Sequence, residues 1–349
     1  MIKLESSIIK QLAGKLNLET KQIDAVLNLL AEGATIPFIA RYRKNQTGAL
    51  NEEQIKEIAD LYNYNKNLLE RKEDVIRLID EKGLLTDTLK ESILACEKLN
   101  EVEDLYRPFK EKRKTKASEA INNGLEPLGK MIMAFPTSGD LKSLTTRFIN
   151  DKVPDEKTAL EQASYIIAEW ISDNAYYRKW IRNNIYLNAL ISSKLKKNAI
   201  DEKNIYEMYY DFSDSLKKIK HYRMLALNRG EKEKILTISL DYDKDSIASY
   251  LEKKIIKNPN SFVTSLVIDS IKDALKRLIL PSVERELRSE LTQKAQKSAI
   301  QTFETNLEHL LLTRPLKNQV VLGFDPGYIN GCKLAVVDKN GKYLNSVVI

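Results

Sequence analysis

One carboxylate stands at a predicted strand end, in the segment VLGFDPGYINGC. The apolar residues before Asp325 predict a strand, and a carboxylate at its end could face a metal ion or a phosphodiester. Two-metal nucleases need several carboxylates that hold two cations about 4 Å apart. Asp325 is therefore a candidate catalytic residue and metal ligand, although one acid is not a complete site. We expect no cofactor, and Mg²⁺ or Mn²⁺ only if the nuclease hypothesis holds.

A second candidate site is a run of cations between residues 107 and 116, where Glu111 is the single acid. Pro108 disfavours one regular helix through the run, so we predict an exposed loop. Lys and Arg near phosphates release condensed counterions, which gives salt-dependent binding that is largely indifferent to base sequence. A solvated or internally paired loop is an equally good interpretation of the charge pattern. The candidate nucleic-acid-binding residues here, called the cationic loop below, are Arg107, Lys110, Lys112, Arg113, Lys114 and Lys116.

A third group combines cations with aromatic rings in AYYRKWIRNN. Aromatic rings stack on unpaired bases while neighbouring cations contact phosphates, so the combination is compatible with single-strand binding. Tyr and Trp at helical spacing belong more often to a core. The candidate contacts are therefore restricted to the cations Arg178, Lys179 and Arg182.

Two further patterns favour structural interpretations. In IARYRKNQTG, cations flank Tyr42, and we favour hydrogen bonds from the arginines to carbonyls at helix ends over a nucleic-acid contact. DYDKDSIASYLE places acids at four ligand positions of an EF-hand loop, but Ser246 replaces the glycine that the turn needs. We therefore favour acids that cap a helix over calcium binding.

The sequence lacks the motifs of several other kinds of site. His221 and His309 are the only histidines, and neither has a Cys or His at the spacing of zinc ligands. Glycine-rich phosphate loops of the Walker or dinucleotide type do not occur. The sequence therefore offers no zinc site, no nucleophile system and no nucleotide-binding loop.

The composition of the chain indicates which kind of fold would position these residues. The chain has 349 residues, of which 43% are hydrophobic and 30% charged, with only 12 Gly and 9 Pro. Such a chain is expected to be mostly helical and to form two or three structural units. It has no apolar run of about 18 residues and no secretory leader pattern, so we predict a cytoplasmic protein without membrane partners. We expect reduced thiols at Cys96 and Cys332, and the net charge of +7 favours polyanions only where it is concentrated.

Periodicity predicts the main elements. Helices are expected over residues 20–33, with Thr20 as cap, and from a capping box of Asn51 and Gln54 to about Lys82. Another follows Thr86 and carries Leu89, Ile93 and Cys96 on one face, and a long one spans 282–312. ILTISLDY alternates like a strand, and the last thirty residues predict a β-meander with a turn at Asn340-Gly341. Three such strands would leave one face uncovered, which is typical of the beginning of a larger α/β domain.

Six segments stand out when they are taken in order along the chain: EGATIPFIARYRKNQTGALNEEQ, LNEVEDLYRPFKEKRKTKASEAINNGLEPL, ALEQASYIIAEWISD, RMLALNRGE, LPSVERELRSE and VLGFDPGYINGCKLAVVD. Together they resemble the Tex family of bacterial transcription accessory proteins. The resemblance implies a mainly α fold with a multi-helix N-terminal region in two parts, residues 1–117 and 191–317. It also implies an inserted helix-turn-helix-like module at 118–190 and the truncated start of a YqgF-type RNase H-like α/β domain at 318–349.

The function that this resemblance implies is a nucleic-acid-binding scaffold associated with transcription, with RNA or DNA and the transcription machinery as partners. The family's C-terminal helix-hairpin-helix elements and OB-fold RNA-binding module would lie outside this chain. The alternatives are a metal-dependent RNase H-like nuclease that uses Asp325, or a mainly protein-binding platform. The first of these hypotheses, the scaffold, involves no enzyme activity. The chain departs from the family at Tyr222, where a His commonly precedes the Arg, so His221 has no assigned role.

Overall fold

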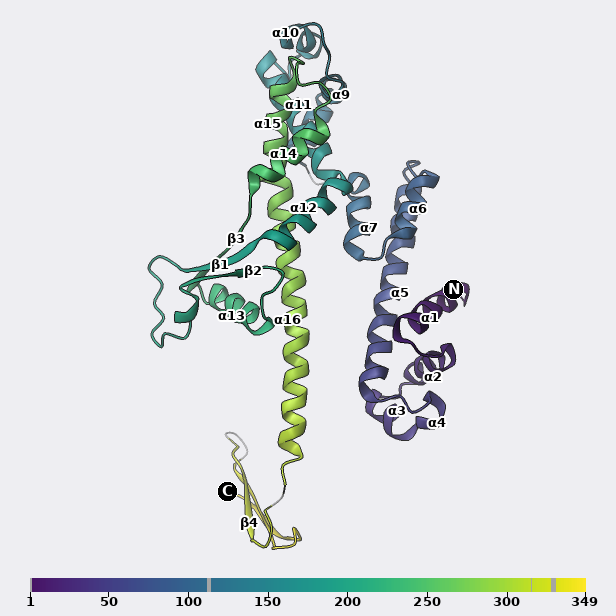
Figure 1. Cartoon of the computed structure of the whole chain (residues 1–349), viewed down its shortest axis with the longest axis vertical. Coiled ribbons are helices and arrows are strands. Elements are labelled where there is room, and N and C mark those ends of the chain that lie inside the picture. The colour runs from purple at the N-terminus through teal and green to yellow at the C-terminus, as the bar shows by residue number, and fades with distance from the viewer. Residues whose placement is uncertain (1, 112–113, 315, 328–330) are drawn as a thin grey trace. The chain divides into compact units, whose positions relative to one another are not determined.

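The computed structural model describes residues 2–111, 114–314, 316–327 and 331–349 (Figure 1). Helices dominate these residues, and two three-stranded sheets accompany them, which confirms the predicted mainly helical fold. The first helices are α1 (Ile2–Leu16), α2 (Thr20–Ala31), α3 (Ile36–Tyr42), α4 (Lys44–Thr47), α5 (Glu52–Asp80), α6 (Asp87–Ala95), α7 (Leu99–Tyr106), α8 (Lys116–Asn122), α9 (Glu126–Met133) and α10 (Leu141–Thr145). The later ones are α11 (Glu156–Asp173), α12 (Ala175–Asn188), α13 (His221–Lys232), α14 (Lys244–Ile255), α15 (Thr264–Asp273) and α16 (Leu280–Leu311).

The described chain divides into two compact units. Unit 1 consists of Met1–Ile191, Ser215–Lys217 and Leu240–Leu287, and unit 2 consists of Ser192–Asp214, Lys218–Ser239 and Arg288–Ile349. The strands are β1 (Leu190–Leu195), β2 (Asp211–Ser215), β3 (Leu236–Asp241), β4 (Val321–Asp325), β5 (Lys333–Val337) and β6 (Tyr343–Val348). The predicted module at 118–190 falls within unit 1, and its helix-turn-helix character stays a prediction.

The long helix α5 begins at the predicted capping box. The Gln54 amide donates to Asn51 Oδ1 at 2.8 Å, and the Asn51 amide donates to Gln54 Oε1 at 3.0 Å. These two bonds satisfy donors that the first turn of a helix leaves open. Ile55 and Ile58 follow at helical spacing and are fully buried against α1, α2 and α3. The start of α5 is therefore the one predicted, and its first apolar residues pack into the core.

Two predicted helix boundaries need correction. The N-cap of α2 is Glu19, whose backbone amide hydrogen-bonds to the Gln22 side chain at 3.1 Å, so Thr20 is the first helical residue. Helix α6 ends at Ala95, and Cys96 is its extended C-cap residue. Gly33, the last residue of the predicted range, follows the end of α2 and has a φ of 88°, in the left-handed region that glycine adopts without strain.

Helix α11 forms the centre of the second half of unit 1. It buries apolar residues along much of its length and contacts α8, α9 and α15. Gly129 on α9 permits a close approach to α11, because a Cβ there would lie 3.1 Å from Trp170 Cη2. Several short helices of this region therefore pack against one longer helix.

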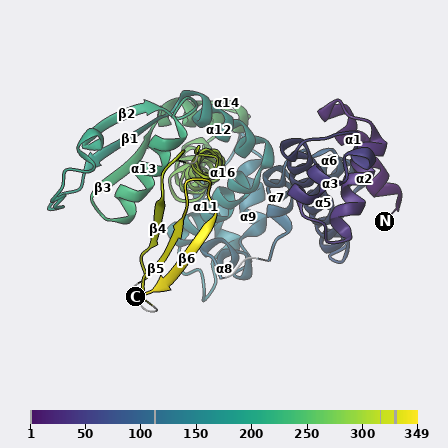
Figure 2. The same ribbon diagram turned by 90° about the horizontal axis from the view of Figure 1, so that it is seen from below.

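The sheet formed by β1, β2 and β3 has the order β2-β1-β3 and is accompanied by α13 (Figure 1 and Figure 2). β3 confirms the alternating segment ILTISLDY. β1 and β2 were missed, because LISSKL and DFSDS are short and polar and give little alternation. Gly230 of α13 lies against β3, where an added Cβ would come within 2.5 Å of Leu236 Cδ1.

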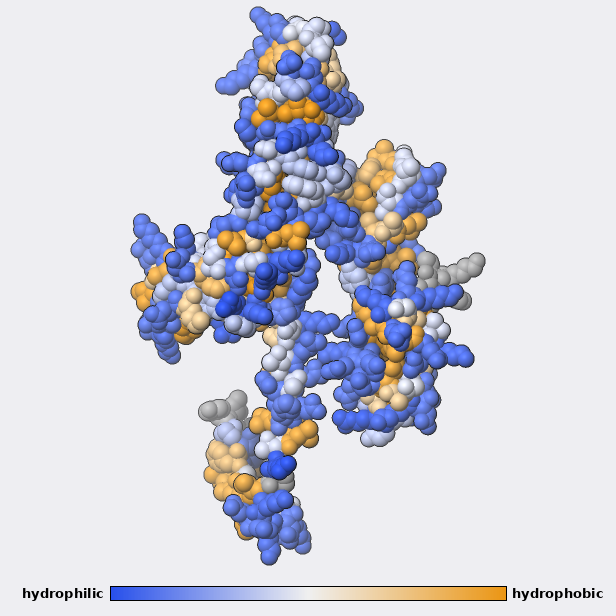
Figure 3. All heavy atoms as spheres, in the orientation of Figure 1, coloured by the Kyte–Doolittle hydropathy of each residue, from blue (hydrophilic) through white to orange (hydrophobic). Residues whose placement is uncertain are grey.

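The predicted β-meander is present as the antiparallel sheet β4-β5-β6. In the connection of β5 to β6, Gly341 has a φ of 80° and donates to the Asp338 carbonyl at 3.0 Å. Leu322, Phe324 and Val347 are 58%, 57% and 54% exposed. Figure 3 shows these strands as a surface with much apolar area.

Two simple expectations concern thiols and membranes. Cys96 and Cys332 are both free, as predicted. Over the described ranges, no helix combines the length and apolar character that crossing a bilayer requires.

Candidate nucleic-acid interface

The cationic loop connects α7 to α8, and of its four cations that the structure describes, Lys110, Lys114 and Lys116 are exposed. Lys110 is exposed behind a short 3₁₀ turn, η1 (Arg107–Phe109). Lys114 Nζ lies 2.9 Å from Glu119 Oε1, and the two side chains are 83% and 51% exposed. Such exposed pairs contribute about 0–1 kcal/mol, so this contact does not withhold Lys114 from a phosphate. Lys112 and Arg113 lie outside the described residues.

The other two cations of the loop have specific neighbours. Lys116 Nζ donates to the Tyr165 hydroxyl at 3.1 Å and lies 4.5 Å from the centroid of that ring. Arg107 is partly buried, and its side chain donates a long hydrogen bond from Nη2 to Ser282 Oγ at 3.5 Å. Burial, and next the charge of Arg178, lower the pKa of Arg107. The loop therefore offers exposed ammonium groups and one partly desolvated guanidinium.

Arg178 and Arg182 require a correction, because both are buried and neither belongs to an exposed surface. Arg178 is 0% and Arg182 7% exposed. Arg178 Nε donates to Asp104 Oδ1 at 2.8 Å, and Arg182 Nη2 donates to Asp104 Oδ2 at 2.8 Å. Both also donate to Glu286, at 2.6 Å from Arg178 Nη2 and 2.7 Å from Arg182 Nη2. We call Asp104, Arg178, Arg182 and Glu286 the buried ion cluster, in which Glu286 is the one member that is partly exposed, at 33% of its side chain.

Electrostatics in the buried ion cluster favour its charged form. Burial by itself raises the pKa of Glu286, but hydrogen bonds from Arg182 and the charges of both arginines outweigh it, and the pKa is lowered. Burial by itself lowers the pKa of Arg182, but the charge of Asp104 and the hydrogen bonds to the two acids raise it overall. Arg178 Nη1 has no hydrogen-bond partner among the described residues. The cluster ties α7, α12 and α16 together inside unit 1.

Lys179 is the one cation of its group that reaches the surface. Its side chain is 60% exposed, and Nζ lies 2.8 Å from Glu101 Oε1. Burial raises the pKa of Glu101, but the hydrogen bond from Lys179 and that from the Glu97 amide lower it overall. This pair stands at the edge of a cavity that sequence analysis did not foresee.

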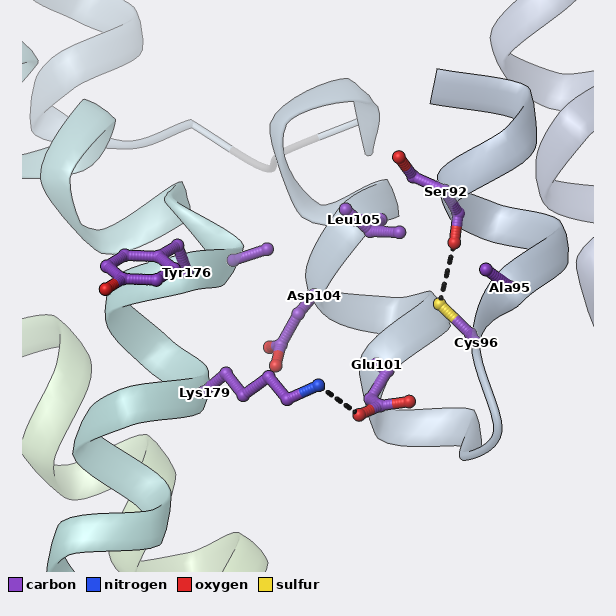
Figure 4. Close-up of a pocket in the computed structure, with 9 residues that line it drawn as sticks. Ser92, Ala95, Cys96, Glu101, Asp104, Leu105, Tyr176 and Lys179 are labelled. Carbon is purple, nitrogen blue, oxygen red and sulfur yellow. Dashed lines mark hydrogen bonds and ion pairs between the residues drawn. The ribbon is translucent and has the colours of Figure 1, made fainter. Parts of the chain in front are cut away.

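The cavity lies where α6, α7 and α12 meet and has a volume of about 300 Å³ (Figure 4). Apolar parts of its wall come from Ala95, Leu105 and Ala175, and Tyr176 also lines it, although its ring points away toward Tyr250. Its polar lining residues are Ser92, Cys96, Glu101, Asp104 and Lys179. The Cys96 thiol donates to the Ser92 carbonyl at 3.3 Å. Because the wall comes from three helices, no single stretch of sequence predicts the cavity. We call it the Tyr176 cavity.

A second cavity, of about 430 Å³, lies beside the base of the cationic loop. Arg107, Lys110 and Arg182 line it together with five acidic residues. Acids outnumber cations in this lining, so the cavity does not form a simple anion site.

Asp325 is the last residue of β4, opposite Lys333 of β5, and it is exposed. Among the residues that the structure describes, no group of three or more His, Cys, Asp or Glu side chains converges as metal ligands would. The position of Asp325 at a strand end confirms the local prediction, while its role as a metal ligand stays a prediction.

Two structural interpretations from the sequence are confirmed. Arg43 Nη1 donates to the Tyr42 carbonyl at 3.2 Å, beside the end of α3. Asp243 Oδ1 accepts from the Ser246 amide at 2.9 Å and caps α14. Arg223, the arginine after Tyr222, lies 2.9 Å from Asp214 Oδ2. Arg43 and Asp243 therefore make their hydrogen bonds at helix ends.

Family models match most of the chain in consecutive pieces. The Tex-like protein N-terminal domain matches residues 6–80, the Tex central region-like model matches 137–303, and the Tex protein YqgF-like domain matches 319–349. The chain belongs to the Tex family. Strands β4 to β6 lie within the YqgF-like match.

Curated relatives cover the whole of this chain. The protein YdcI of Bacillus subtilis is 47% identical over 99% of the chain and 48% of its own length. The transcriptional accessory protein Tex of Neisseria gonorrhoeae is 35% identical over 98% of the chain and 46% of its length. The human S1 RNA-binding domain-containing protein 1 is 28% identical over 100% of the chain and 36% of its length. The chain therefore spans half or less of the length of these relatives.

Proposed function

We propose that this chain is a nucleic-acid-binding scaffold that acts with the transcription machinery. The observation that carries the proposal is the series of three Tex family matches, together with relatives named as a transcriptional accessory protein and as an RNA-binding-domain protein. The exposed side chains of Lys110, Lys114 and Lys116 support it, because ammonium groups held at the surface can replace counterions on a phosphate backbone.

The test measures affinity for a labelled single-stranded RNA and for a DNA duplex at increasing salt. One variant changes Lys112, Arg113, Lys114 and Lys116 to Ala. If these four side chains contact phosphates, the variant binds more weakly at low salt, and its slope of log affinity against log salt is smaller by up to about 3 units for RNA. Absence of binding even at low salt would reject direct nucleic-acid contact.

A matched control removes four cations elsewhere. Lys10, Lys15, Lys21 and Lys66 are exposed, and their change to Ala alters the net charge by the same amount. This control should keep the original salt slope if the loop makes the contacts. Equal losses in both variants would mean that only the total charge matters.

The alternative proposal is a metal-dependent nuclease in which Asp325 is a metal ligand. Its support is the position of Asp325 at the end of β4, inside the YqgF-like match. The experiment uses the intact protein with Mg²⁺ or Mn²⁺. Cleavage that is lost in Asp325→Asn supports this alternative, cleavage that survives the substitution removes Asp325 from it, and no cleavage with either metal favours the scaffold.

A protein-binding platform is the remaining alternative, in which the exposed cations meet acidic surfaces of the transcription machinery. Affinity purification with and without nuclease treatment separates it from the scaffold. Partners that disappear after digestion were held through RNA or DNA, whereas partners that remain contact the protein directly.

A further inference from the structure

A second cationic segment lies in the turn between β2 and α13 (Figure 1), and it is not among the sites predicted from the sequence. Residues 215–223, SLKKIKHYR, contain four Lys or Arg residues and no acid. Ile219 is buried, while Lys218 and Lys220 on either side of it are exposed. An apolar residue therefore anchors the turn, and both ammonium groups reach solvent.

Tyr222 follows these lysines in the first turn of α13. The helix buries Met224 and Leu227, and with about 3.6 residues per turn Tyr222 falls on the opposite side of the helix. Tyr222 is 64% exposed. Its aromatic ring is therefore accessible to a planar ligand on the side of α13 that faces away from the core.

We propose that Tyr222, Lys218 and Lys220, called the Tyr222 patch below, bind one segment of a single-stranded nucleic acid. The ring of Tyr222 stacks on an unpaired base, and the two ammonium groups contact the adjoining phosphates. The patch selects no particular base, because every base has a π face. The proposal rests on the proposed function and adds a contact in unit 2, whereas the cationic loop belongs to unit 1.

The first argument is that a fixed cation lies beside the Tyr222 ring. Arg223 Cζ lies 5.8 Å from the centroid of Tyr222 and 5.5 Å from the centroid of Phe212. Arg223 Nη1 donates to Asp214 Oδ2 at 2.9 Å, which holds the guanidinium in place. A cation at this distance attracts the ring and restricts its motion before a base arrives. Less conformational entropy is then lost on binding.

The second argument is an excess of positive charge around the ring. Asp214 compensates Arg223, but Lys218 and Lys220 form no ion pair within the described part of the chain. Asp211, the other acid of β2, lies on the opposite face of that strand from Asp214, because successive side chains of a strand alternate. Two uncompensated ammonium groups beside an exposed ring form the combination that binds single strands through phosphates and stacked bases.

An unpaired strand suits the patch better than a duplex or a protein surface does. In a duplex the bases stack on one another, so a side chain reaches their faces only after neighbouring pairs have been unstacked. Lysine is depleted at protein–protein interfaces, whereas it is the common partner of backbone phosphates. The Tyr222 patch should therefore distinguish single strands from duplexes of the same length.

The anisotropy of a labelled single-stranded RNA, measured at increasing salt, separates stacking from charge. Tyr222→Ala should weaken binding at least about fivefold at every salt concentration, the lower end of base–aromatic stacking, without a change in the slope of log affinity against log salt. Tyr222→Phe keeps the ring and should bind like the parent chain. Lys218→Ala combined with Lys220→Ala should instead reduce the slope by up to about 1.4 units, because each phosphate contact on a single strand contributes about 0.7.

Two matched controls come from unit 1. Tyr176→Ala removes another exposed tyrosine, whose hydroxyl is paired with that of Tyr250. Lys10→Ala combined with Lys15→Ala removes two exposed lysines and the same amount of charge as the patch variant. Both controls should keep the affinity and the salt slope of the parent chain. Losses as large as those of the patch variants would overturn the Tyr222 patch.

The remaining outcomes separate the patch from the scaffold. Binding that weakens in the cationic-loop variant but is unchanged in the patch variants would overturn the Tyr222 patch and leave the scaffold intact. An equal loss for a duplex in Tyr222→Ala would also overturn it, because paired bases offer no free face. Absence of binding by the parent chain at low salt would reject the scaffold and the patch together.

Discussion

Arg178 and Lys179 are neighbours on α12, yet their side chains meet opposite environments. Arg178 is fully buried between Asp104 and Glu286, whereas Lys179 is 60% exposed and pairs with Glu101. A buried guanidinium has lost its hydration and depends on its carboxylate partners, while an exposed ammonium keeps most of its water. Identical charge at adjacent positions therefore has different energetic consequences.

A matched pair of substitutions measures that difference. Arg178→Met should lower the free energy of unfolding by about 3–5 kcal/mol, because it removes a fully buried guanidinium and leaves the buried carboxylate of Asp104 with one partner fewer. Lys179→Met should change it by less than about 1 kcal/mol, because exposed ion pairs contribute little. Urea unfolding of both variants gives the comparison. Similar small effects in both would mean that the buried ion cluster is not a stabilising centre.

Acid should weaken the buried ion cluster in a defined direction. Burial opposes the charged form of Glu286, but the two arginines outweigh it, so its pKa in the folded chain is below the ordinary value of 4.5. The unfolded chain therefore binds the proton first, and the stabilisation is present above about pH 4.5 and is lost as the pH falls through the lowered pKa.

The measurement is the urea midpoint at a series of pH values from neutral to acid. The parent chain should lose stability steeply on acidification. Glu286→Gln starts less stable, and its dependence on pH below about 4.5 should be shallower because one titrating group is gone. A parallel shift of the two curves would argue against this role of Glu286.

At the scale of elements, features set by neighbouring residues could be predicted from the sequence, whereas features set by residues far apart in the sequence could not. The start of α5 was predictable, because Asn51 and Gln54 are three residues apart and the side chain of each accepts a hydrogen bond from the backbone amide of the other. Strands β1 and β2 were not, because their pairing joins short polar segments whose own patterns carry little information. The burial of Arg178 depends on Asp104 and Glu286, which are 74 and 108 positions away. The Tyr176 cavity likewise depends on three helices meeting.

Two helical glycines give opposite predictions. An added Cβ at Gly230 would lie 2.5 Å from Leu236 Cδ1, and Leu236 is itself buried. Gly14 in α1 has nothing within 4 Å of the same position. Gly14→Ala should therefore stabilise the protein by up to about 1 kcal/mol through helix propensity, whereas Gly230→Ala should destabilise it by about 1–3 kcal/mol through overpacking.

Thermal unfolding followed by circular dichroism compares the two glycine variants with the parent chain. Stabilisation by Gly230→Ala would show that Leu236 can move aside at little cost. A loss of stability in Gly14→Ala would show that α1 has a closer neighbour than the structure places there.

At the scale of the whole molecule, the two compact units predict unfolding in more than one step. Both tryptophans, Trp170 and Trp180, lie in unit 1, so intrinsic fluorescence reports that unit, while circular dichroism reports helices of both. The two transitions should not coincide, because chains with several units depart from two-state behaviour. Arg178→Met should shift the fluorescence transition, and Gly230→Ala should leave it nearly unchanged. Coincident transitions that both variants shift equally would indicate one cooperative unit.

The shared carboxylates of the buried ion cluster have an evolutionary consequence. Asp104 and Glu286 each accept hydrogen bonds from both arginines. Substitution of one member therefore leaves uncompensated charge on the other three. Replacement of all four by apolar residues of similar volume can avoid that cost. Homologous sequences should therefore retain positions 104, 178, 182 and 286 as a set or exchange them together, and this covariation should link segments that no local motif connects.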